Sequence, residues 1–331
     1  MAAVSTNLQG ALLSLAAFGV YATHDLLVKF LGSSYSPVQL IFYSVLLGFP
    51  LVTVMLMSDR TDGNLVPRHP WWTLLRSATG VINALTGFYA FSVLPLAQVY
   101  AIVFAMPILI TLMAIPLLGE RIGLHRGVAV VVGLLGVLIV LQPGGAEFSL
   151  GHLAALVAAM MGATTSVIVR KIGKEERSIV LMLYPMVANF VVMVVLLPFV
   201  YVPMPIQHLG LLALMSALGV GGGLFLIAAY RRAPAVIVAP MQYSQIIWAI
   251  VFGWLFFAES IDIRTAIGTA VIIASGIYIV LREDKPSVSR NRPVTEGPSR
   301  YDTASLPKSS IWNRVFDRRQ AEAEPGTVDV D

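Results

Sequence analysis

Long apolar runs, each about as long as a membrane is thick, follow one another along the chain. A helix needs about 20 apolar residues to cross the hydrocarbon core of a bilayer. Ten stretches come close to this length: residues 9–31, 37–57, 72–93, 96–118, 123–141, 150–170, 178–200, 208–230, 235–257 and 263–282. Because these runs are unbroken and do not alternate with polar residues, they predict ten transmembrane helices and not the strands of a barrel.

The composition supports a membrane protein. Hydrophobic residues make up 57% of the 331 residues and charged residues only 12%, whereas a soluble domain carries about 25% charged residues. The lead of residues 1–7 contains no Lys or Arg, so the first run is expected to be a retained helix and not a signal peptide. The chain has no cysteine and no metalloprotease, serine-hydrolase or phosphate-loop motif. We therefore expect no enzyme, no metal and no cofactor.

The two halves of the sequence carry the same landmarks in the same order. A shift of 139 residues places Pro95 on Pro234 and Glu120 on Glu259. A shift of 141 residues places Gly10 on Gly151, Lys29 on Arg170 and Tyr43 on Tyr184. This order predicts an internal duplication, with five helices in each half. Because five is odd, the second copy must be inserted upside down, which is typical of transporters.

Basic residues favour one side of the expected membrane. With the N-terminus in the cytoplasm, the inner loops hold Arg60, Arg68, Arg121, Arg126, Arg170, Lys171, Lys174, Arg177, Arg231 and Arg232. The outer side then holds only Lys29 and Arg264. This bias predicts that both termini are cytoplasmic. It also explains the net charge of +4 without a nucleic-acid partner, because no basic patch interleaved with aromatic residues accompanies it.

Residues 283–331 differ in composition from the rest of the chain. They are rich in Ser, Pro and charged residues of both signs and predict a disordered cytoplasmic tail. Within them, Ile311, Trp312, Val315 and Phe316 fall on one helical face beside three arginines. This segment either rests on the inner leaflet or is an ordinary part of the tail.

The stretch 88–143 contains Leu94-Pro95, then Leu118-Gly119-Glu120-Arg121-Ile122, and it resembles an EamA domain. The same features recur around Pro234 and Glu259. Two such domains resemble the drug/metabolite transporter superfamily. The resemblance implies an all-α membrane protein of two inverted five-helix repeats, residues 8–143 and 149–282, in the bacterial inner membrane. Helices 1–4 and 6–9 would line a central cavity, and helices 5 and 10 would lie at the periphery.

The segments that begin at Asp25 and Ala239 are similar to bacterial carriers that take up riboflavin or S-adenosylmethionine. The resemblance therefore implies alternating access with riboflavin as the first expected substrate and S-adenosylmethionine as the second. An exporter of amino acids or other metabolites and a flippase of lipid-linked substrates are the alternatives. The expected partners are a small-molecule metabolite and membrane lipid, and a homodimer is left open.

Ionisable residues inside a predicted helix are the first candidates for function, because placing them in lipid is costly. Asp25 and Lys29 are four residues apart and could form a neutral pair, with Lys29 reaching the interface. Alternatively, Asp25 faces the cavity and binds a cationic or polar substrate group, or a coupling proton passed through His24. Arg76 is expected to reach lipid phosphate, and binding of an anionic substrate group is the alternative.

Glu120 and Glu259 are expected to be structural. Each ends one predicted helix and opens the next, where a carboxylate can accept backbone N–H groups of the following helix.

Polar and aromatic residues gather on the helices that would line the cavity. They suit a planar ligand held by stacking and a few hydrogen bonds, although packing and interhelical hydrogen bonding are the alternative. The candidate substrate-binding residues are Tyr21, Asp25, Asn83, Tyr89, Gln98, Tyr100, Tyr184, Gln242, Tyr243, Gln245 and Trp248. Phe104 occupies the position equivalent to Tyr243. Pro107, Pro116, Pro185 and Pro240 are expected to kink their helices or free carbonyl groups.

Overall fold

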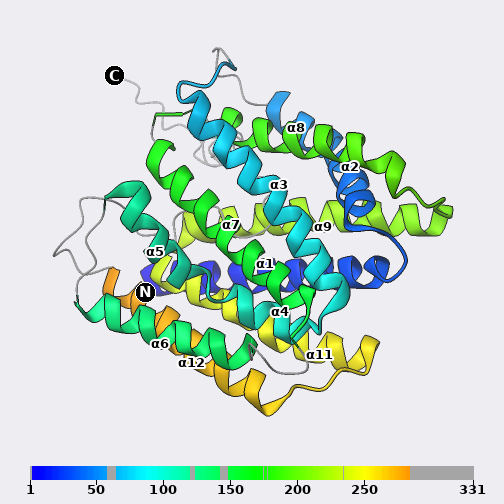
Figure 1. Cartoon of the computed structure of the whole chain (residues 1–331). Helices are drawn as coiled ribbons and strands as arrows, with labels where there is room; N and C mark the ends of the chain where they lie inside the picture. The colour runs from blue at the N-terminus through cyan, green and yellow to red at the C-terminus, as the bar shows by residue number, and fades with distance from the viewer. Residues whose placement is uncertain are drawn as a thin grey trace, which may run out of the picture.

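All regular structure in the described part of the chain is helical (Figure 1). The computed structural model describes residues 2–57, 65–119, 124–141, 148–173, 175–176, 178–233 and 235–283. Glu283, expected to begin the tail, is the last residue of the helix Ile263–Glu283; the rest of the expected tail lies outside the described residues, as do Glu120, Arg121 and Arg60.

The first repeat contains α1 (Ala2–Gly32), α2 (Pro37–Met57), α3 (Pro70–Val93), α4 (Leu96–Val103), α5 (Met106–Leu118) and α6 (Leu124–Leu141). The second contains α7 (Leu150–Ile172), α8 (Ser178–Leu196), α9 (Ile206–Arg232), α10 (Ala235–Val238), α11 (Gln245–Phe257) and α12 (Ile263–Glu283). Two 3-10 turns, η1 (Leu197–Phe199) and η2 (Ala239–Ser244), complete these elements. Each predicted apolar run matches one helix or a consecutive pair, so the predicted fold class is confirmed.

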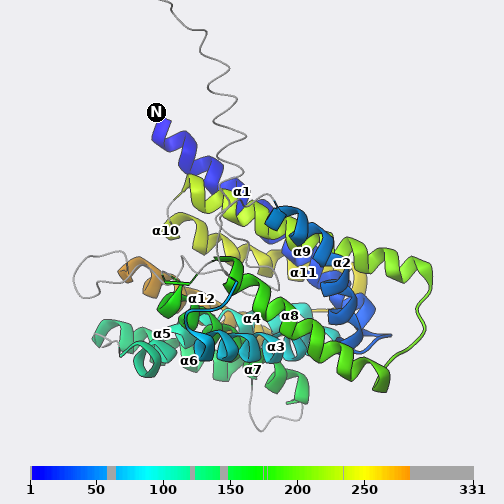
Figure 2. The same ribbon diagram turned by 90° about the horizontal axis from the view of Figure 1, so that it is seen from above.

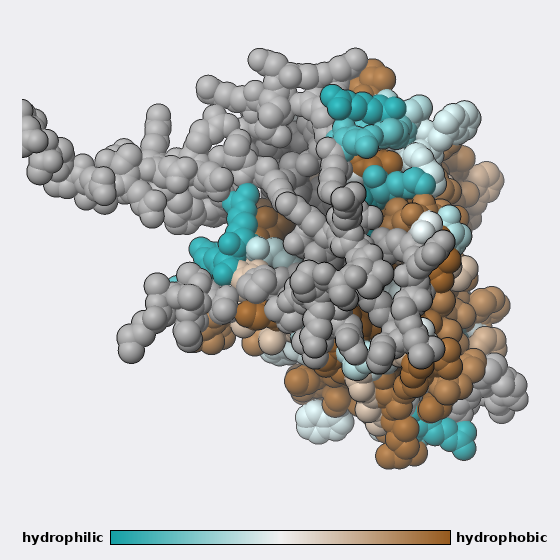
Figure 3. Space-filling model, turned by 90° about the vertical axis from the view of Figure 1, so that its left-hand side faces the viewer, coloured by the Kyte–Doolittle hydropathy of each residue, from teal (hydrophilic) through white to brown (hydrophobic). Residues whose placement is uncertain are grey.

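The helices carry the apolar surface of a membrane protein. Five segments are long and apolar enough to cross a bilayer by themselves: Leu8–Gly32, Leu96–Leu118, Leu150–Ile172, Val180–Phe199 and Ile206–Arg232. Large apolar side chains such as Phe199, Ile206 and Trp254 are mostly exposed. Apolar side chains also cover much of the described surface in Figure 3. Such a surface is stable in contact with lipid and not with water.

Two of the membrane-spanning segments are interrupted at equivalent places. Phe104 and Ala105 separate α4 from α5, just before Pro107. In the second repeat, the 3-10 turn η2 contains Pro240 and separates α10 from α11. Proline lacks the N–H that continues an α-helix, which explains both interruptions. Pro116 and Pro185 instead lie inside the continuous helices α5 and α8.

Helices of one repeat pack along helices of the other in two equivalent pairs (Figures 1 and 2). In the pair α1–α9, a Cβ at Gly10 would collide with Ala233, which follows α9. In the pair α3–α7, a Cβ at Gly151 would collide with Val93 and Leu94. The same close approach therefore occurs twice, as expected for a duplicated unit.

The helices α6 and α12 form a third pair at the edge of the bundle (Figure 1). A Cβ at Gly136 would lie 2.9 Å from Ile272 Cγ1 and 3.0 Å from the Gly268 carbonyl oxygen, so glycine allows the two backbones to approach closely. These are the fifth and tenth membrane-spanning helices, and they lie at the periphery where the family resemblance placed them.

Two histidines repeat the same role at opposite ends of the bundle. The hydroxyl oxygen of Tyr35, just after α1, lies 2.7 Å from His208 Nδ1 near the start of α9. The carboxylate oxygen Oε2 of Glu175, just after α7, lies 2.7 Å from His69 Nε2 at the start of α3. The Glu176 carboxylate also accepts the His69 backbone N–H at 2.5 Å. The repeat thus conserves the position of each histidine but exchanges a phenol for two carboxylates.

Candidate functional site

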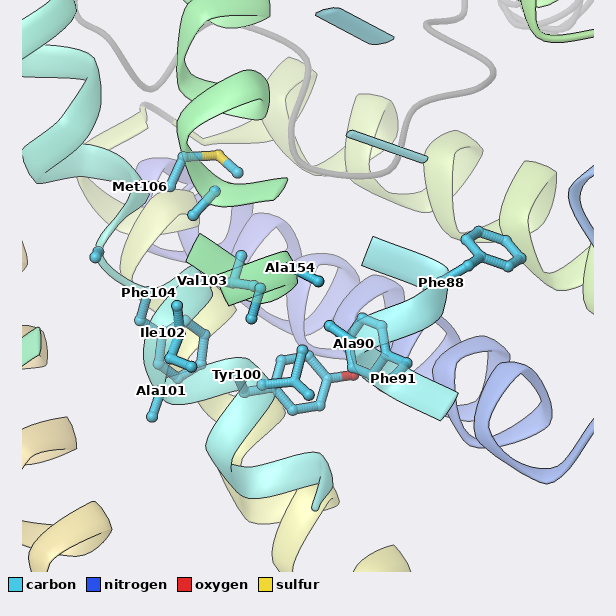
Figure 4. Close-up of a cluster of buried hydrophobic side chains, with 14 of the residues drawn as sticks. Phe88, Ala90, Phe91, Tyr100, Ala101, Ile102, Val103, Phe104, Met106 and Ala154 are labelled. Atoms are coloured by element: carbon cyan, nitrogen blue, oxygen red, sulfur yellow. The ribbon is translucent and has the colours of Figure 1, made fainter. Parts of the chain in front are cut away.

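The short helix α4 lies at the centre of the protein. Tyr100, Ile102 and Phe104 are fully buried, and Phe91 of α3 lies beside Tyr100 (Figure 4). The rings of Phe91 and Tyr100 meet edge to face with centroids 5.5 Å apart. Because every residue of α4 except the half-buried Gln98 is buried, the buried polar groups of this helix must find partners inside the bundle.

A buried carboxylate supplies the partner for Tyr100. The Tyr100 hydroxyl donates to Asp25 Oδ2 at 2.6 Å, and His24 Nδ1 lies 2.9 Å from Asp25 Oδ1. Asp25 is only 2% exposed and His24 7%. A hydrogen bond to an ionised carboxylate is shorter and stronger than one between neutral groups. The structure thus brings together three of the predicted residues, His24, Asp25 and Tyr100, from α1 and α4.

Stacked aromatic rings connect this carboxylate with the second repeat. Tyr100 stacks on Phe104 with centroids 6.1 Å apart, and Phe104 meets Tyr243 edge to face at 5.1 Å. The Tyr243 hydroxyl reaches α12, where it contacts the space that a Cβ at Gly276 would fill. Tyr243 therefore contacts both Phe104 and α12.

Two other predicted aromatic residues pack between α1 and its neighbours. The Tyr21 ring lies against Gly222 of α9, and the Trp248 indole of α11 lies 3.4 Å from the Cβ position of Gly19. Gln245, one turn before Trp248, is 2% exposed. In both contacts an aromatic ring packs directly against a glycine. The two rings therefore pack between helices, and their part in ligand binding stays a prediction.

The remaining predicted residues lie farther from this centre. Asn83 Oδ1 lies 3.6 Å from the Cβ position of Gly162 on α7, so it belongs to the α3–α7 contact. Tyr89, Gln98 and Gln242 are half-buried, and Tyr184 is 38% exposed. Their participation in binding remains a prediction.

Lys29 does not pair with Asp25 as one sequence alternative proposed. Its ammonium nitrogen lies 2.6 Å from Glu259 Oε1 and donates to the Leu94 carbonyl at 2.5 Å. Lys29 is also 8% exposed, so its side chain is buried among protein groups. The partner is 230 positions away in the sequence, which is why helical spacing alone favoured the wrong carboxylate.

The prediction that Glu259 accepts N–H groups of the helix that follows it is also wrong. Glu259 Oε2 accepts the backbone N–H of Leu96, the first residue of α4, at 3.1 Å. Asp262 is the residue that accepts an N–H of α12, from Thr265 at 3.4 Å. Glu259 thus contacts a helix N-terminus, but that helix belongs to the other repeat, and the structural role of Glu259 stays a prediction.

Arg76 does not reach lipid phosphate in this structure. It is 2% exposed, and its guanidinium donates to the Leu181 carbonyl of α8. The residue pattern could not reveal this contact, because a backbone acceptor leaves no mark in it. Among the described residues, no group of three His, Cys, Asp or Glu side chains could hold a metal ion.

Comparison with known proteins gives one family match that covers both halves. The sequence profile of the EamA-like transporter family matches residues 8–142 and 149–282. The pseudopaline exporter CntI of Pseudomonas aeruginosa is 26% identical over 273 residues, which span 82% of this chain and 95% of that protein. The S-adenosylmethionine uptake transporter of Rickettsia prowazekii is 23% identical over 293 residues, 87% of this chain and 98% of that protein.

A crystal structure shares the fold. It matches with a TM-score of 0.57 and 17% sequence identity, and the match covers 83% of this chain and 98% of the other. At this identity the likeness concerns the path of the backbone alone.

Proposed function

The chain belongs to the EamA-like transporter family, and on that premise we propose that it carries a small organic metabolite bearing a positive charge across the bacterial cytoplasmic membrane. The carrier is a membrane transporter and not an enzyme. Its inverted repeats suit alternating access, in which two halves rock about a central site.

The observation that carries the proposal is the buried Asp25 carboxylate. In the described part of the chain, its hydrogen-bond and ion-pair partners are His24 and Tyr100, and Lys29 is engaged by Glu259. A carboxylate in a water-poor interior attracts a positive charge strongly. The two charges that fit are a proton and a cationic group of the substrate. Competition between them would couple substrate movement to the proton gradient.

The aromatic residues beside Asp25 favour a ligand that also has a planar ring. Tyr100, Phe104 and Tyr243 offer ring faces and edges from both repeats. S-adenosylmethionine combines an aromatic base with a sulfonium and an ammonium group, so it fits both features. Riboflavin is planar but carries no cation for Asp25, and neither relative described above is named for it. We therefore propose S-adenosylmethionine ahead of riboflavin, which reverses the order expected from the sequence.

Uptake is the proposed direction, and export is the second candidate because one relative is named as an exporter. We also propose that both termini are cytoplasmic. Lys29 near the end of α1 contacts Leu94 after α3, so α3 begins at the N-terminal end of α1. The exposed Arg68, Lys171 and Arg231 lie at that same end, which supports a cytoplasmic assignment.

Flux into proteoliposomes that contain the purified chain tests the proposal. Radiolabelled S-adenosylmethionine should accumulate with saturable kinetics, and excess unlabelled S-adenosylmethionine should compete. Methionine lacks the aromatic base and the sulfonium group, and adenosine and riboflavin lack a cationic group, so all three should compete weakly. Loading the vesicles instead of the bath measures export. Absence of saturable flux in both directions, for every compound in this panel, would overturn the proposed substrate class.

A further inference from the structure

A second charged cluster joins the two repeats at the end of the bundle farthest from the N-terminus. Lys29 near the C-terminal end of α1 contacts Glu259, which lies between α11 and α12. The same ammonium group donates to the carbonyl of Leu94 after α3, and it lies 5.1 Å from the ring centroid of Phe257. Lys29 thereby contacts groups at the C-terminal ends of α3 and α11 from its own place at the end of α1.

The cluster also holds the N-terminus of α4. Glu259 Oε2 accepts the Leu96 N–H at 3.1 Å, so the carboxylate divides its two oxygens between an ammonium ion and a helix N-terminus. Both partners are positive, and both stabilise the ionised carboxylate. Because Lys29 and Glu259 have side chains only 10% and 18% exposed, loss of either partner would strand the other charge.

The backbone around Glu259 is shaped for this contact. Ala258 has a left-handed conformation with φ 53°, which a residue with a Cβ rarely adopts. It ends α11 and turns Glu259 back, where the Glu259 N–H donates to the Gly253 carbonyl at 2.9 Å. A Cβ at Gly253 would lie 2.8 Å from Glu259 Oε2, so glycine leaves the room that the carboxylate occupies.

Building on the proposed transport function, we propose that Lys29 and Glu259 form a latch that closes this end of the pathway between the repeats. The latch acts on the same two helices as the central site. Lys29 lies one helical turn beyond Asp25 on α1, and Leu96 lies one turn before Tyr100 on α4. Separation of Lys29 from Glu259 releases the N-terminus of α4 from Glu259 and moves Tyr100 relative to Asp25, while the Phe104–Tyr243 contact holds the other end of α4. Opening of this end and occupancy of the site are thus coupled through α1 and α4.

The latch has a fixed polarity. The Leu94 carbonyl can only accept a hydrogen bond, and the Leu96 N–H can only donate one. Exchange of the two charges, Lys29→Glu with Glu259→Lys, would restore the ion pair but oppose both backbone groups. A simple ion pair would tolerate the exchange, whereas the latch should remain open.

Cysteine labelling can test the latch directly, because the natural chain contains no cysteine. Ser92→Cys places a thiol beside Gly32, where α1 and α3 are in close contact at the latched end. Ser33→Cys at the same end is exposed and reports reagent access. Ser77→Cys is buried near the opposite end of α3 and reports general loosening of the protein. Each of these three cysteine variants is combined with Glu259→Gln, with Lys29→Met or with the charge exchange. The purified proteins are then reacted with a membrane-impermeant maleimide.

The matched control is Asp262→Asn, which removes a carboxylate from the same connection but leaves both latch residues in place. Latch variants should raise the labelling rate at Ser92→Cys at least fivefold over this control, while the rates at Ser33→Cys and Ser77→Cys stay unchanged. Equal Ser92→Cys rates in latch variants and control would overturn the latch, and so would faster Ser77→Cys labelling, which signals unfolding. Labelling needs no substrate, so the latch can succeed or fail independently of the S-adenosylmethionine assignment.

Discussion

Phe104 and Tyr243 occupy equivalent positions in the two repeats, and their rings meet edge to face at a centroid distance of 5.1 Å. Each residue lies at the interruption of its membrane-spanning segment, Phe104 between α4 and α5 and Tyr243 within η2. The interruption in the first repeat therefore contacts the equivalent interruption in the second repeat. In carriers with inverted repeats, interrupted helices of this kind surround the substrate site. Tyr100 extends the contact from Phe104 to Asp25, which has Ser166 as its counterpart in the second repeat.

Replacement of Asp25 by Asn should abolish the pH dependence of flux. The amide keeps the size of the carboxylate but cannot exchange a proton or balance a cation. Flux of labelled substrate into proteoliposomes at several values of external pH measures the effect. Asp262→Asn makes the same chemical change at an exposed site and should retain the normal profile. Full, pH-dependent transport by the Asp25 variant would remove this residue from the mechanism.

Replacement of Tyr100 by Phe should weaken transport while the aromatic packing survives. The variant loses only the hydroxyl that donates to Asp25 at 2.6 Å. A hydrogen bond to a charged group contributes about 1.5–3 kcal/mol, so the fall in substrate affinity when Asp25 loses this support is bounded at about 10- to 150-fold. Binding measured by titration calorimetry checks this. Tyr35→Phe, which loses a hydroxyl at the periphery, should leave affinity unchanged; an equal loss in both variants would contradict a specific role for Tyr100.

Replacement of Gly136 by Val should destabilise the α6–α12 pair. A side chain there would press on Ile272 and on the backbone of Gly268, neither of which can move freely. Overpacking of this kind costs about 1–3 kcal/mol, and the thermal unfolding midpoint in detergent should fall by several degrees. Gly127→Val on the same helix meets no atom within 4 Å and serves as the control. Identical midpoints for the two variants would show that the helices do not pack this closely.

Replacement of Gln39 by Leu should release the segment between α8 and α9. The Gln39 amide accepts the Val202 N–H at 2.9 Å and donates to the Val202 carbonyl at 2.7 Å. Leucine leaves both backbone groups without this partner, at a cost of about 1–3 kcal/mol. Limited proteolysis should then cut near Val202 faster, whereas exposed Gln207→Leu should have no effect. If cleavage rates are the same in both variants, Gln39 does not hold this segment.

The sequence by itself determined the helical architecture and its duplication. Runs such as 150–170 and 208–230 have the length of a membrane span, and in lipid a chain must satisfy its backbone hydrogen bonds within each span. Pro107 and Pro240 coincide with the two interruptions, but Pro116 and Pro185 lie inside continuous helices, so the prolines named candidate positions and did not decide which helices break. These features depend on neighbours along the chain, which the sequence displays directly.

Only the tertiary structure decided which charged groups meet. Helical spacing offered Asp25 as the partner of Lys29, and chain order offered α12 as the helix that Glu259 would cap. The folded chain instead pairs Lys29 with Glu259. Lys29 donates to the Leu94 carbonyl, Glu259 accepts the Leu96 N–H, and Asp25 accepts the Tyr100 hydroxyl. Arg76 was expected at lipid phosphate and contacts a buried carbonyl. A charge inside a membrane protein binds the strongest complementary group within reach, and that group is fixed by helix packing between the repeats and not by distance along the chain.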